Sequence, residues 1–296
     1  MKTLSNIVGF EYNKRKDISL SPFETFLKYT DEKEKSSIVL KNILNELFSH
    51  KKTTILDIGS GDGTYIMSTL KKTEISEESQ IVLLEPSKNL IKKLKNKLRH
   101  SSFRNLKIKM VNMTLDHFAR EKILFRIIIA SHSPINKERL PQTLLKMLNL
   151  LRNGGHLIIV LRKKDETYRF RTKFKSHLLN DRNYKSLVID DALKILRELK
   201  KYKPLKIRVF KSDSKLYLPM DKNRKDTISI IEFFLNEKWG NIPKTIQKEI
   251  DIYIKRKKGI FRQTDGFVLV TKNNYVAKQI VEGLSGKIWA GPYPKI

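Results

Sequence analysis

The stretch that most constrains the fold is residues 53–67, which read T-T-I-L-D-I-G-S-G-D-G-T-Y-I-M. A short apolar run that carries Asp57 ends in the glycine-rich turn 59–63, and a helix-compatible segment follows at 64–72. This order predicts a strand, a tight turn and a helix, which is how a βαβ unit begins. Glycine permits positive φ and close approach of a ligand, and the first turn of a helix offers unpaired N–H groups. The turn is therefore a candidate ligand site.

An acidic residue follows the turn at a distance that suits a ribose. The next apolar run, 81–84, ends at Glu85. An acid about 20 residues after the glycines, at the carboxyl end of the next strand, is placed to bind a pair of ribose hydroxyls. A G-x-G-x-G turn alone is weak evidence, but Asp57 inside the first apolar run and Glu85 after the second strengthen it.

Together, I-L-D-I-G-S-G-D-G and L-L-E-P-S resemble the first two motifs of class I S-adenosylmethionine-dependent methyltransferases. The resemblance implies an enzyme that binds S-adenosyl-L-methionine and transfers its methyl group. NAD enzymes use a similar turn, but they rarely place an aspartate two residues before the first glycine, so nucleotide binding is kept as the alternative. The cofactor-binding residues that the resemblance implies are Asp57, Gly59, Ser60, Gly61, Asp62, Gly63, Glu85, Pro86, Ser87, Met113, Thr114, Leu115 and Ser131.

Strand-like and helix-like segments alternate after the turn, which predicts a parallel doubly wound sheet. Residues 123–131 are almost wholly apolar, as a central parallel strand should be. A helix at 138–151 is expected to end at the glycines of 153–155. With the resemblance, we expect an α/β fold: a doubly wound, mostly parallel seven-stranded sheet with an N-terminal helical cover and an inserted helical lid. The other strands are expected at 53–58, 80–85, 106–112, 156–162, 206–211 and 266–271.

The pattern, taken with the resemblance to methyltransferases, implies four parts of the chain. Ser21-Pro22 with Glu24 predicts a capped helix start, and the apolar residues of 36–48 share one helical face. The expected parts are an N-terminal helical cover (1–50), a cofactor-binding Rossmann-like core (51–164), a substrate-lid insertion with the remaining strands (165–260), and the last strand with a C-terminal tail (261–296).

The composition limits the class of protein. Of 296 residues, 40% are hydrophobic, which is enough for a globular core. No apolar run approaches the roughly 20 residues of a membrane span, and the N-terminus has no signal-like apolar region. The absence of cysteine excludes disulfides and fits a reducing compartment, so we expect a cytoplasmic protein. We also expect a monomer. The six histidines show no metal-binding spacing, so no metal is expected.

The net charge of +30 leaves two interpretations open. It can attract a polyanion such as RNA. It can also reflect an AT-rich genome, because the lysines are dispersed and no RNA-binding motif is visible. Ala130 to Ile135 stands where base-modifying enzymes carry an N/D-P-P-Y/F motif, which weighs against adenine methylation. An RNA methyltransferase and a non-catalytic cofactor-binding protein remain the alternatives.

In chain order, the sequence contains the segments F-L-K-Y-T-D-E-K, L-L-E-P-S, M-T-L, I-I-E-F-F-L-N-E-K-W and F-R-Q-T-D-G-F-V-L-V. This order of segments is similar to histamine N-methyltransferase and its relatives. In that family, a glutamate of the N-terminal segment and an asparagine before the last strand hold the substrate amine. The resemblance implies these roles for Glu32 and Gln263, with Asp31 as an adjacent alternative to Glu32. Without such a role, Glu32 would simply be a solvent-exposed residue at the end of a helix. A carboxylate and an amide carbonyl orient N–H groups and attract a cation.

The chain departs from that family at the acceptor site. Ile135 and Asn136 replace paired tyrosines, and Leu90 replaces a glutamine, so histamine itself is in doubt. Aromatic residues elsewhere can supply replacement walls or can be simple core. These aromatics are Tyr168, Phe170 and Trp239.

Methyl transfer from a sulfonium depends mainly on alignment of the nucleophile, so a strong catalytic signature is not required. His132 follows a central strand at the edge where ligands bind, and it is either a general base or a packing residue. We expect methyl transfer to a nitrogen of a small-molecule or peptide amine, with His132, Glu32 and Gln263 as the catalytic candidates.

Overall fold

The computed structural model describes residues 21–48, 52–99, 103, 106–133, 137–179, 186–220 and 223–273. Residues 1–20 of the expected N-terminal cover, Ile135, Asn136 and the tail beyond residue 273 lie outside these residues. Among the described helices, none combines the length and the hydropathy that a membrane span requires.

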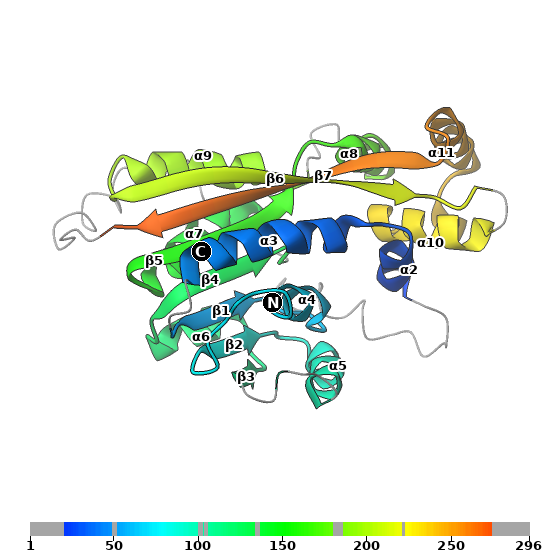
Figure 1. The fold of residues 1–296 in the computed structure, drawn as a ribbon. Coiled ribbons are helices and arrows are strands. Elements are labelled where there is room, and N and C mark those ends of the chain that lie inside the picture. Colours follow the sequence, from blue (N-terminus) through cyan, green and yellow to red (C-terminus); the bar gives the residue numbers. More distant parts are fainter. Residues whose placement is uncertain are drawn as a thin grey trace, which may run out of the picture.

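The described strands form one seven-stranded sheet in the order β3-β2-β1-β4-β5-β7-β6 (Figure 1). The first five strands are parallel, and β7 runs antiparallel to both of its neighbours. This arrangement confirms the predicted doubly wound, mostly parallel sheet. The strands are β1 (Thr54–Ile58), β2 (Gln80–Leu84), β3 (Lys107–Val111), β4 (Phe125–Ser131), β5 (Leu151–Arg162), β6 (Leu205–Tyr217) and β7 (Ile260–Lys272).

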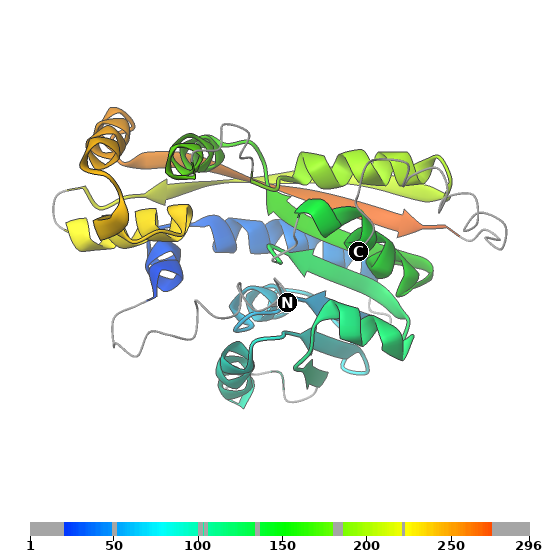
Figure 2. The same ribbon diagram turned by 180° about the vertical axis from the view of Figure 1, so that it is seen from behind.

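Helices cover both faces of the sheet. One hydrophobic cluster joins α3, α4 and α5 to one face, which is turned toward the viewer in Figure 1. A second cluster joins α6, α7 and α9 to the opposite face, seen in Figure 2. The helices on these faces are α3 (Glu32–Phe48), α4 (Thr64–Leu70), α5 (Lys88–Arg99), α6 (Leu115–Phe118), α7 (Leu140–Asn149) and α9 (Ile189–Lys200). Short 3-10 turns lie at Ala119–Glu121, Lys137–Arg139 and Trp239–Asn241.

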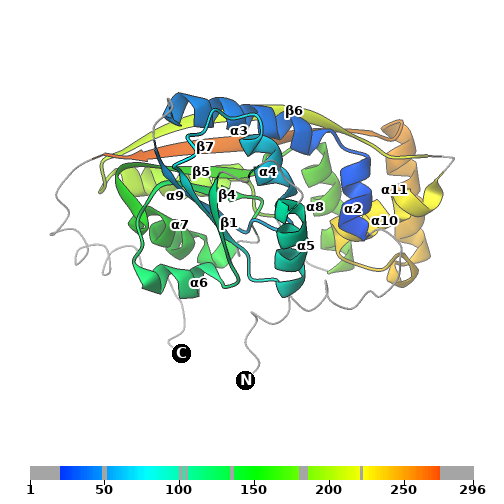
Figure 3. The ribbon, with the colours of Figure 1, turned by 60° about the horizontal axis from the view of Figure 1, so that its bottom comes forward.

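Strands β6 and β7 have 13 residues each, much longer than the five to seven of β1–β4, and helices pack around their far ends in a third cluster (Figure 3). Four helices pack there: α2 (Pro22–Lys28), α8 (Glu166–Leu178), α10 (Arg224–Leu235) and α11 (Lys244–Arg256). Phe170 of α8 is 1% exposed and meets Phe261 of β7 edge to face, with ring centroids 5.7 Å apart. Phe170 is therefore a core residue and not a wall of an acceptor site.

The start of α2 follows the predicted capping arrangement. Glu24 N donates to the Ser21 hydroxyl at 3.2 Å, and Ser21 N donates to the Glu24 carboxylate at 2.8 Å. Pro22 occupies the first helical position, where its missing N–H costs nothing.

The predicted glycine stop at 153–155 is wrong. Helix α7 ends at Asn149, and β5 has already begun at Leu151. A Cβ on Gly155 would lie 2.8 Å from the carbonyl oxygen of Arg152 and 3.0 Å from that of Arg126. These glycines allow a tight strand entry, and glycine in this context has the same sequence signal as a helix C-cap.

Substitution of the last glycine of the turn tests the packing of α4 under α5. Gly63 has φ +77°, and a Cβ there would lie 2.3 Å from Leu94 Cδ1. Gly63→Ala should lower the free energy of unfolding in urea by about 2–5 kcal/mol, from backbone strain and overpacking together.

Gly61 has φ +59°, but a Cβ there would have no atom within 4 Å among the described residues, so Gly61→Ala should lower the free energy of unfolding by only about 1–2 kcal/mol. Gly240→Ala, which has neither feature, is the control; equal losses at Gly61 and Gly63 would contradict the packing.

Candidate functional site

The glycine turn is held by backbone hydrogen bonds to the neighbouring strand. Gly59 N and Ser60 N donate to the carbonyl oxygen of Leu84 at 2.8 and 3.1 Å, and Gly63 N donates to that of Ser60 at 3.0 Å. Gly59, Gly61 and Gly63 all have φ between +59° and +77°. The alternating positive φ values explain why the turn needs glycine at every second position.

Ser133, which the sequence did not single out, supports the turn from the next strand. Its hydroxyl is buried and donates to the carbonyl oxygen of Ile58. A Cβ on Gly59 would lie only 2.7 Å from Ser133 Oγ. Gly59 is therefore required for close approach of the turn to β4, as well as for its φ.

Glu85 lies beside the turn 59–63, and together they form what we call the cradle. Its carboxylate is buried and accepts hydrogen bonds from Gly61 N at 3.0 Å and Ser87 N at 2.9 Å. Asn112 Nδ2 holds the Glu85 carbonyl oxygen at 2.9 Å. A carboxylate has about four acceptor positions, so each oxygen retains one for a ligand hydroxyl. The geometry fits a ribose diol.

Asp57 lies beneath the turn and is 4% exposed. Burial raises the pKa of Asp57 to about 7, with a further increase from the nearby Glu85 carboxylate and an opposing decrease from the Ser60 side chain. An ionised Asp57 is therefore costly until a cationic ligand group approaches it.

The other predicted cofactor residues lie at the same carboxyl edge of the strands. Asp62 accepts from Lys97 Nζ at 2.5 Å and from Thr64 N at 3.1 Å, which commits its carboxylate to the start of α4. Thr114 caps α6 through its hydroxyl. The remaining ones are Pro86 and Ser87 after β2, Met113 and Leu115 packed against the core after β3, and Ser131 at the end of β4. Their contact with a cofactor stays a prediction.

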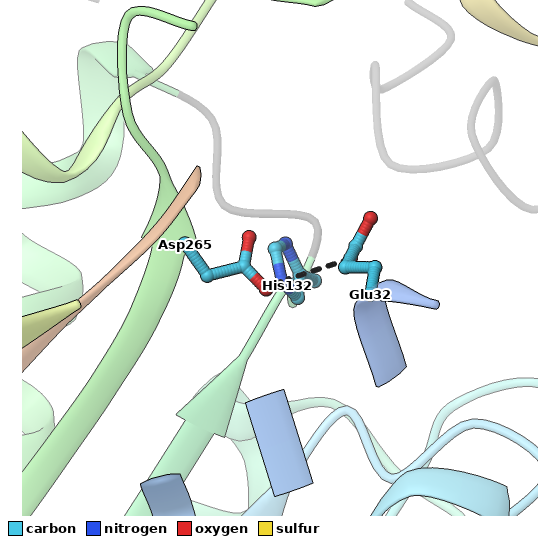
Figure 4. A group of neighbouring side chains, drawn as sticks. All are labelled: Glu32, His132 and Asp265. Carbon is cyan, nitrogen blue, oxygen red and sulfur yellow. Dashed lines mark ion pairs between the residues drawn. The ribbon is translucent and has the colours of Figure 1, made fainter. Parts of the chain in front are cut away.

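A cluster of charged side chains lies beyond the end of β4. His132 Nε2 is 3.5 Å from Glu32 Oε1 and 3.3 Å from Asp265 Oδ2, so the ring lies between the two carboxylates (Figure 4). Arg162 pairs through Nη2 with Glu32 and lies 3.4 Å through Nη1 from Asp165 Oδ2. Three carboxylates thus surround one permanent cation and one titratable ring.

The charges shift one another's pKa values. Burial alone would raise the pKa of Asp265, but His132 and Arg162 outweigh it and hold that pKa below its usual range. Burial would lower the pKa of His132, but Asp265 and Glu32 raise it above its ordinary value. With His132 neutral, the cluster carries a net negative charge inside a strongly basic protein.

The structure brings Glu32 and Gln263 together from opposite ends of the chain. Glu32 is 5% exposed and Gln263 is 1% exposed, so Glu32 is not a solvated helix end. Thr30 joins them, because its hydroxyl contacts Gln263 Oε1 at 2.7 Å and accepts from Glu32 N at 3.2 Å. Asp31 is directed elsewhere: its carboxylate accepts from Lys215 N at 2.6 Å and pairs with Lys35 at 2.7 Å. The catalytic roles of Glu32, Gln263 and His132 stay predictions.

Arg162 and Tyr65, like Ser133, are site residues that were missed in the sequence. Arg162 is the last residue of β5, and Tyr65 is in the first turn of α4, where its hydroxyl lies 2.9 Å from Ser36 Oγ. Burial raises the pKa of Tyr65, so the phenol stays neutral. The position of Arg162 at the carboxyl end of an apolar strand was a usable signal, whereas Tyr65 looked like an ordinary helix residue.

Glu32, His132 and Asp265 offer ligand atoms within 4.8 Å of one another, which is close enough for a metal ion. The guanidinium of Arg162 already pairs with Glu32 and disfavours a second, doubly charged cation. We assign no metal to the cluster.

Comparisons with known proteins agree with this geometry. Residues 49–200, just over half of the chain, match a family model described as a methyltransferase domain. Among solved structures, the YcgJ protein from Bacillus subtilis is 11% identical with a TM-score of 0.51, covering 81% of this chain and 99% of its own. A candidate methyltransferase from Bacillus halodurans is 13% identical with a TM-score of 0.51, covering 79% and 98%. None of the curated proteins matches the chain.

The raised pKa of Asp57 predicts that this residue destabilises the ligand-free fold at alkaline pH. Because the folded state holds the Asp57 proton more tightly than the unfolded state, stability falls as pH rises from about 3.8 to 7. Asp57→Asn should therefore raise the free energy of unfolding at pH 8 by at most about 4 kcal/mol, and change it little at pH 4.

Asp62→Asn is the matched control with the opposite sign. The pKa of Asp62 is lowered: burial opposes the shift, but Lys97 and Thr64 outweigh it. Its stabilisation is present above the unfolded pKa and is lost as pH falls, so the variant should be less stable at pH 8. Urea unfolding at both pH values checks both variants, and a destabilised Asp57→Asn at pH 8 would refute the assignment.

Proposed function

This chain belongs to the methyltransferase-domain family and is a class I S-adenosylmethionine-dependent methyltransferase, and from that premise we propose that it methylates an amine nitrogen of a small molecule or peptide. The observation that carries the proposal is the placement of the Glu32 and Asp265 carboxylates on either side of His132 Nε2. The cluster follows β4, beside the cradle formed by 59–63 and Glu85, at the edge where ligands bind in open α/β sheets.

The fit of the cradle to the cofactor rests on Glu85 and Asp57. The remaining acceptor positions of Glu85 suit the ribose hydroxyls, and an acid beneath the turn suits the cationic methionine end. When bound, S-adenosylmethionine supplies the methyl on a sulfonium, which becomes a neutral thioether as the new N–C bond forms.

The charged residues of the cluster bind the acceptor amine and take up its proton. An aliphatic amine reaches the site as an ammonium ion, and buried carboxylates attract that charge. The ammonium must lose one proton before nitrogen has a lone pair to offer, and neutral His132 can accept it at Nε2. Asp265, 3.3 Å away, then stabilises the imidazolium. Alignment of the resulting amine in a water-poor site provides most of the acceleration.

The local charge also bears on the RNA alternative. The basic surface attracts RNA, but the carboxylates of Glu32, Asp165 and Asp265 repel phosphates at the site itself. Labelled methyl from the cofactor should therefore enter a pool of amines and peptides and not total RNA. Label in RNA with unlabelled amines would reverse this ranking.

Glu85→Gln should weaken binding of S-adenosylhomocysteine about 10- to 100-fold, because a neutral amide replaces a charged acceptor of the ribose hydroxyls. Calorimetry gives the affinity. Glu78→Gln is the control, since Glu78 is 71% exposed and pairs only loosely with Lys52, 3.5 Å away. Undiminished binding by Glu85→Gln would remove Glu85 from the cofactor site.

The raised pKa of His132 predicts the pH dependence of the reaction. A base must be neutral, so kcat should rise with pH through an inflection above 6.5. His132→Asn should lose that inflection and lower kcat by about 10²–10⁴-fold. His177→Asn, on the exposed side of α8, should change neither. An unaltered pH profile in His132→Asn would exclude the ring as the base.

A further inference from the structure

Two buried side chains of β7, two residues apart, carry polar atoms that lack hydrogen-bond partners among the described residues. Gln263 and Asp265 are each 1% exposed, and they share the face of β7 that is turned toward α3. Among the described residues, Gln263 Nε2 has no hydrogen-bond partner, and the Asp265 carboxylate has none besides the ion pair of its Oδ2 with His132 Nε2, 3.3 Å away. An unmade buried hydrogen bond costs about 1–3 kcal/mol, so such atoms in a site indicate a ligand that completes them.

The orientation of the Gln263 amide follows from counting hydrogens at Thr30. The Thr30 hydroxyl has one hydrogen, and Glu32 N already donates to its oxygen at 3.2 Å. Its other two neighbours are Gln263 Oε1 at 2.7 Å and the carbonyl oxygen of Lys215 at 3.2 Å.

The Lys215 carbonyl has a second donor in Asp31 N, at 3.2 Å, so the Thr30 hydrogen is available to Gln263. A length of 2.7 Å is also typical of O–H···O and short for N–H···O. Gln263 therefore directs Oε1 to Thr30, and its NH₂ group is left to donate to something else.

We propose that the acceptor is an amine with a carbonyl or carboxylate oxygen on the adjacent carbon, as in an amino acid or the N-terminus of a peptide. This inference rests on the proposed amine methylation. Asp265 accepts hydrogen bonds from the amine, and Gln263 Nε2 donates to the neighbouring oxygen. The two positions are two residues apart on one strand, about 7 Å, which suits a ligand of amino-acid size between them.

Other acceptor classes leave one of these groups unpaired. A simple alkylamine satisfies Asp265 but leaves the Gln263 amide buried without an acceptor. A phosphate-rich acceptor can accept from Gln263, but it brings negative charge toward Asp265 and Glu32. Only a ligand with adjacent donor and acceptor groups completes both residues.

Matched acceptor pools test the proposal. One pool contains amino-acid amides, and the other contains the corresponding amines in which hydrogen replaces the carboxamide. The unaltered protein should methylate the amides with a kcat/KM at least about 10-fold higher. Gln263→Met, which keeps the side-chain length but removes the donor, should lose most of that preference, measured as the ratio of the two kcat/KM values.

The ratio of kcat/KM between the two pools is compared between the unaltered protein and each variant. Differences in amine basicity cancel in this comparison, because every protein receives the same acceptors at the same pH. Gln80→Leu, at an exposed position at the start of β2, is the control and should keep the preference. Thr30→Val, which removes the hydroxyl that fixes the amide, should reduce the preference and serves as the second variant. Urea unfolding and S-adenosylhomocysteine affinity establish that each variant is folded.

The outcomes distinguish failure of this inference from failure of the proposed amine methylation. Methylation of both pools with the same ratio in the unaltered protein, Gln263→Met and Thr30→Val would overturn this inference and leave amine methylation in place. Failure to methylate either pool by a protein that binds S-adenosylhomocysteine would overturn the amine function itself. A preference for amides that disappears with the Gln263 donor supports both.

Discussion

The ion pair between Glu32 and Arg162 is the interaction on which the site depends. It joins the first turn of the cover helix α3 to the carboxyl end of β5, two parts of the chain that are 130 residues apart. Arg162 also faces Asp165, and its charge helps to keep the buried Asp265 ionised. Removal of one partner from a buried pair strands the other charge at a large cost. The pair therefore fixes α3 over the site and sets the electrostatics there at the same time.

Several buried polar groups of the site destabilise the ligand-free fold. Asp57 has a pKa raised to about 7 by burial, Gln263 Nε2 has no hydrogen-bond partner among the described residues, and the buried Asp265 carboxylate has only its ion pair with His132 there. These groups share the α3 face of the sheet, while the opposite face packs α6, α7 and α9 against an apolar surface. The apolar face and the aromatic cluster at the ends of β6 and β7 can offset that cost. The buried polar groups of the site thus lie beside the hydrophobic cluster that α3, α4 and α5 form on the same face of the sheet.

Local patterns decided how well each element could be predicted. The turn 59–63 was predictable because alternating positive φ demands glycine, and the start of α2 because capping uses residues three positions apart. The glycines at 154 and 155 misled the prediction, because a strand that passes close to another backbone needs glycine just as a helix end does. The choice between Asp31 and Glu32 was also beyond local reasoning, since they are adjacent and differ only in what the fold places opposite them.

By itself, the sequence determined the class of the protein: the two motifs around Asp57 and Glu85 and the alternation of apolar strands with helices specify a methyltransferase sheet and its cofactor edge. These signals are local, because each depends on residues within one strand, turn or helix. Only the tertiary structure decided the acceptor side. Glu32, His132, Arg162, Gln263 and Asp265 come from α3, β4, β5 and β7, and no short-range pattern records that they meet. Burial and mutual charge, which arise only when these elements pack, raise the pKa of His132, lower that of Asp265, and leave Gln263 Nε2 buried without a hydrogen-bond partner among the described residues.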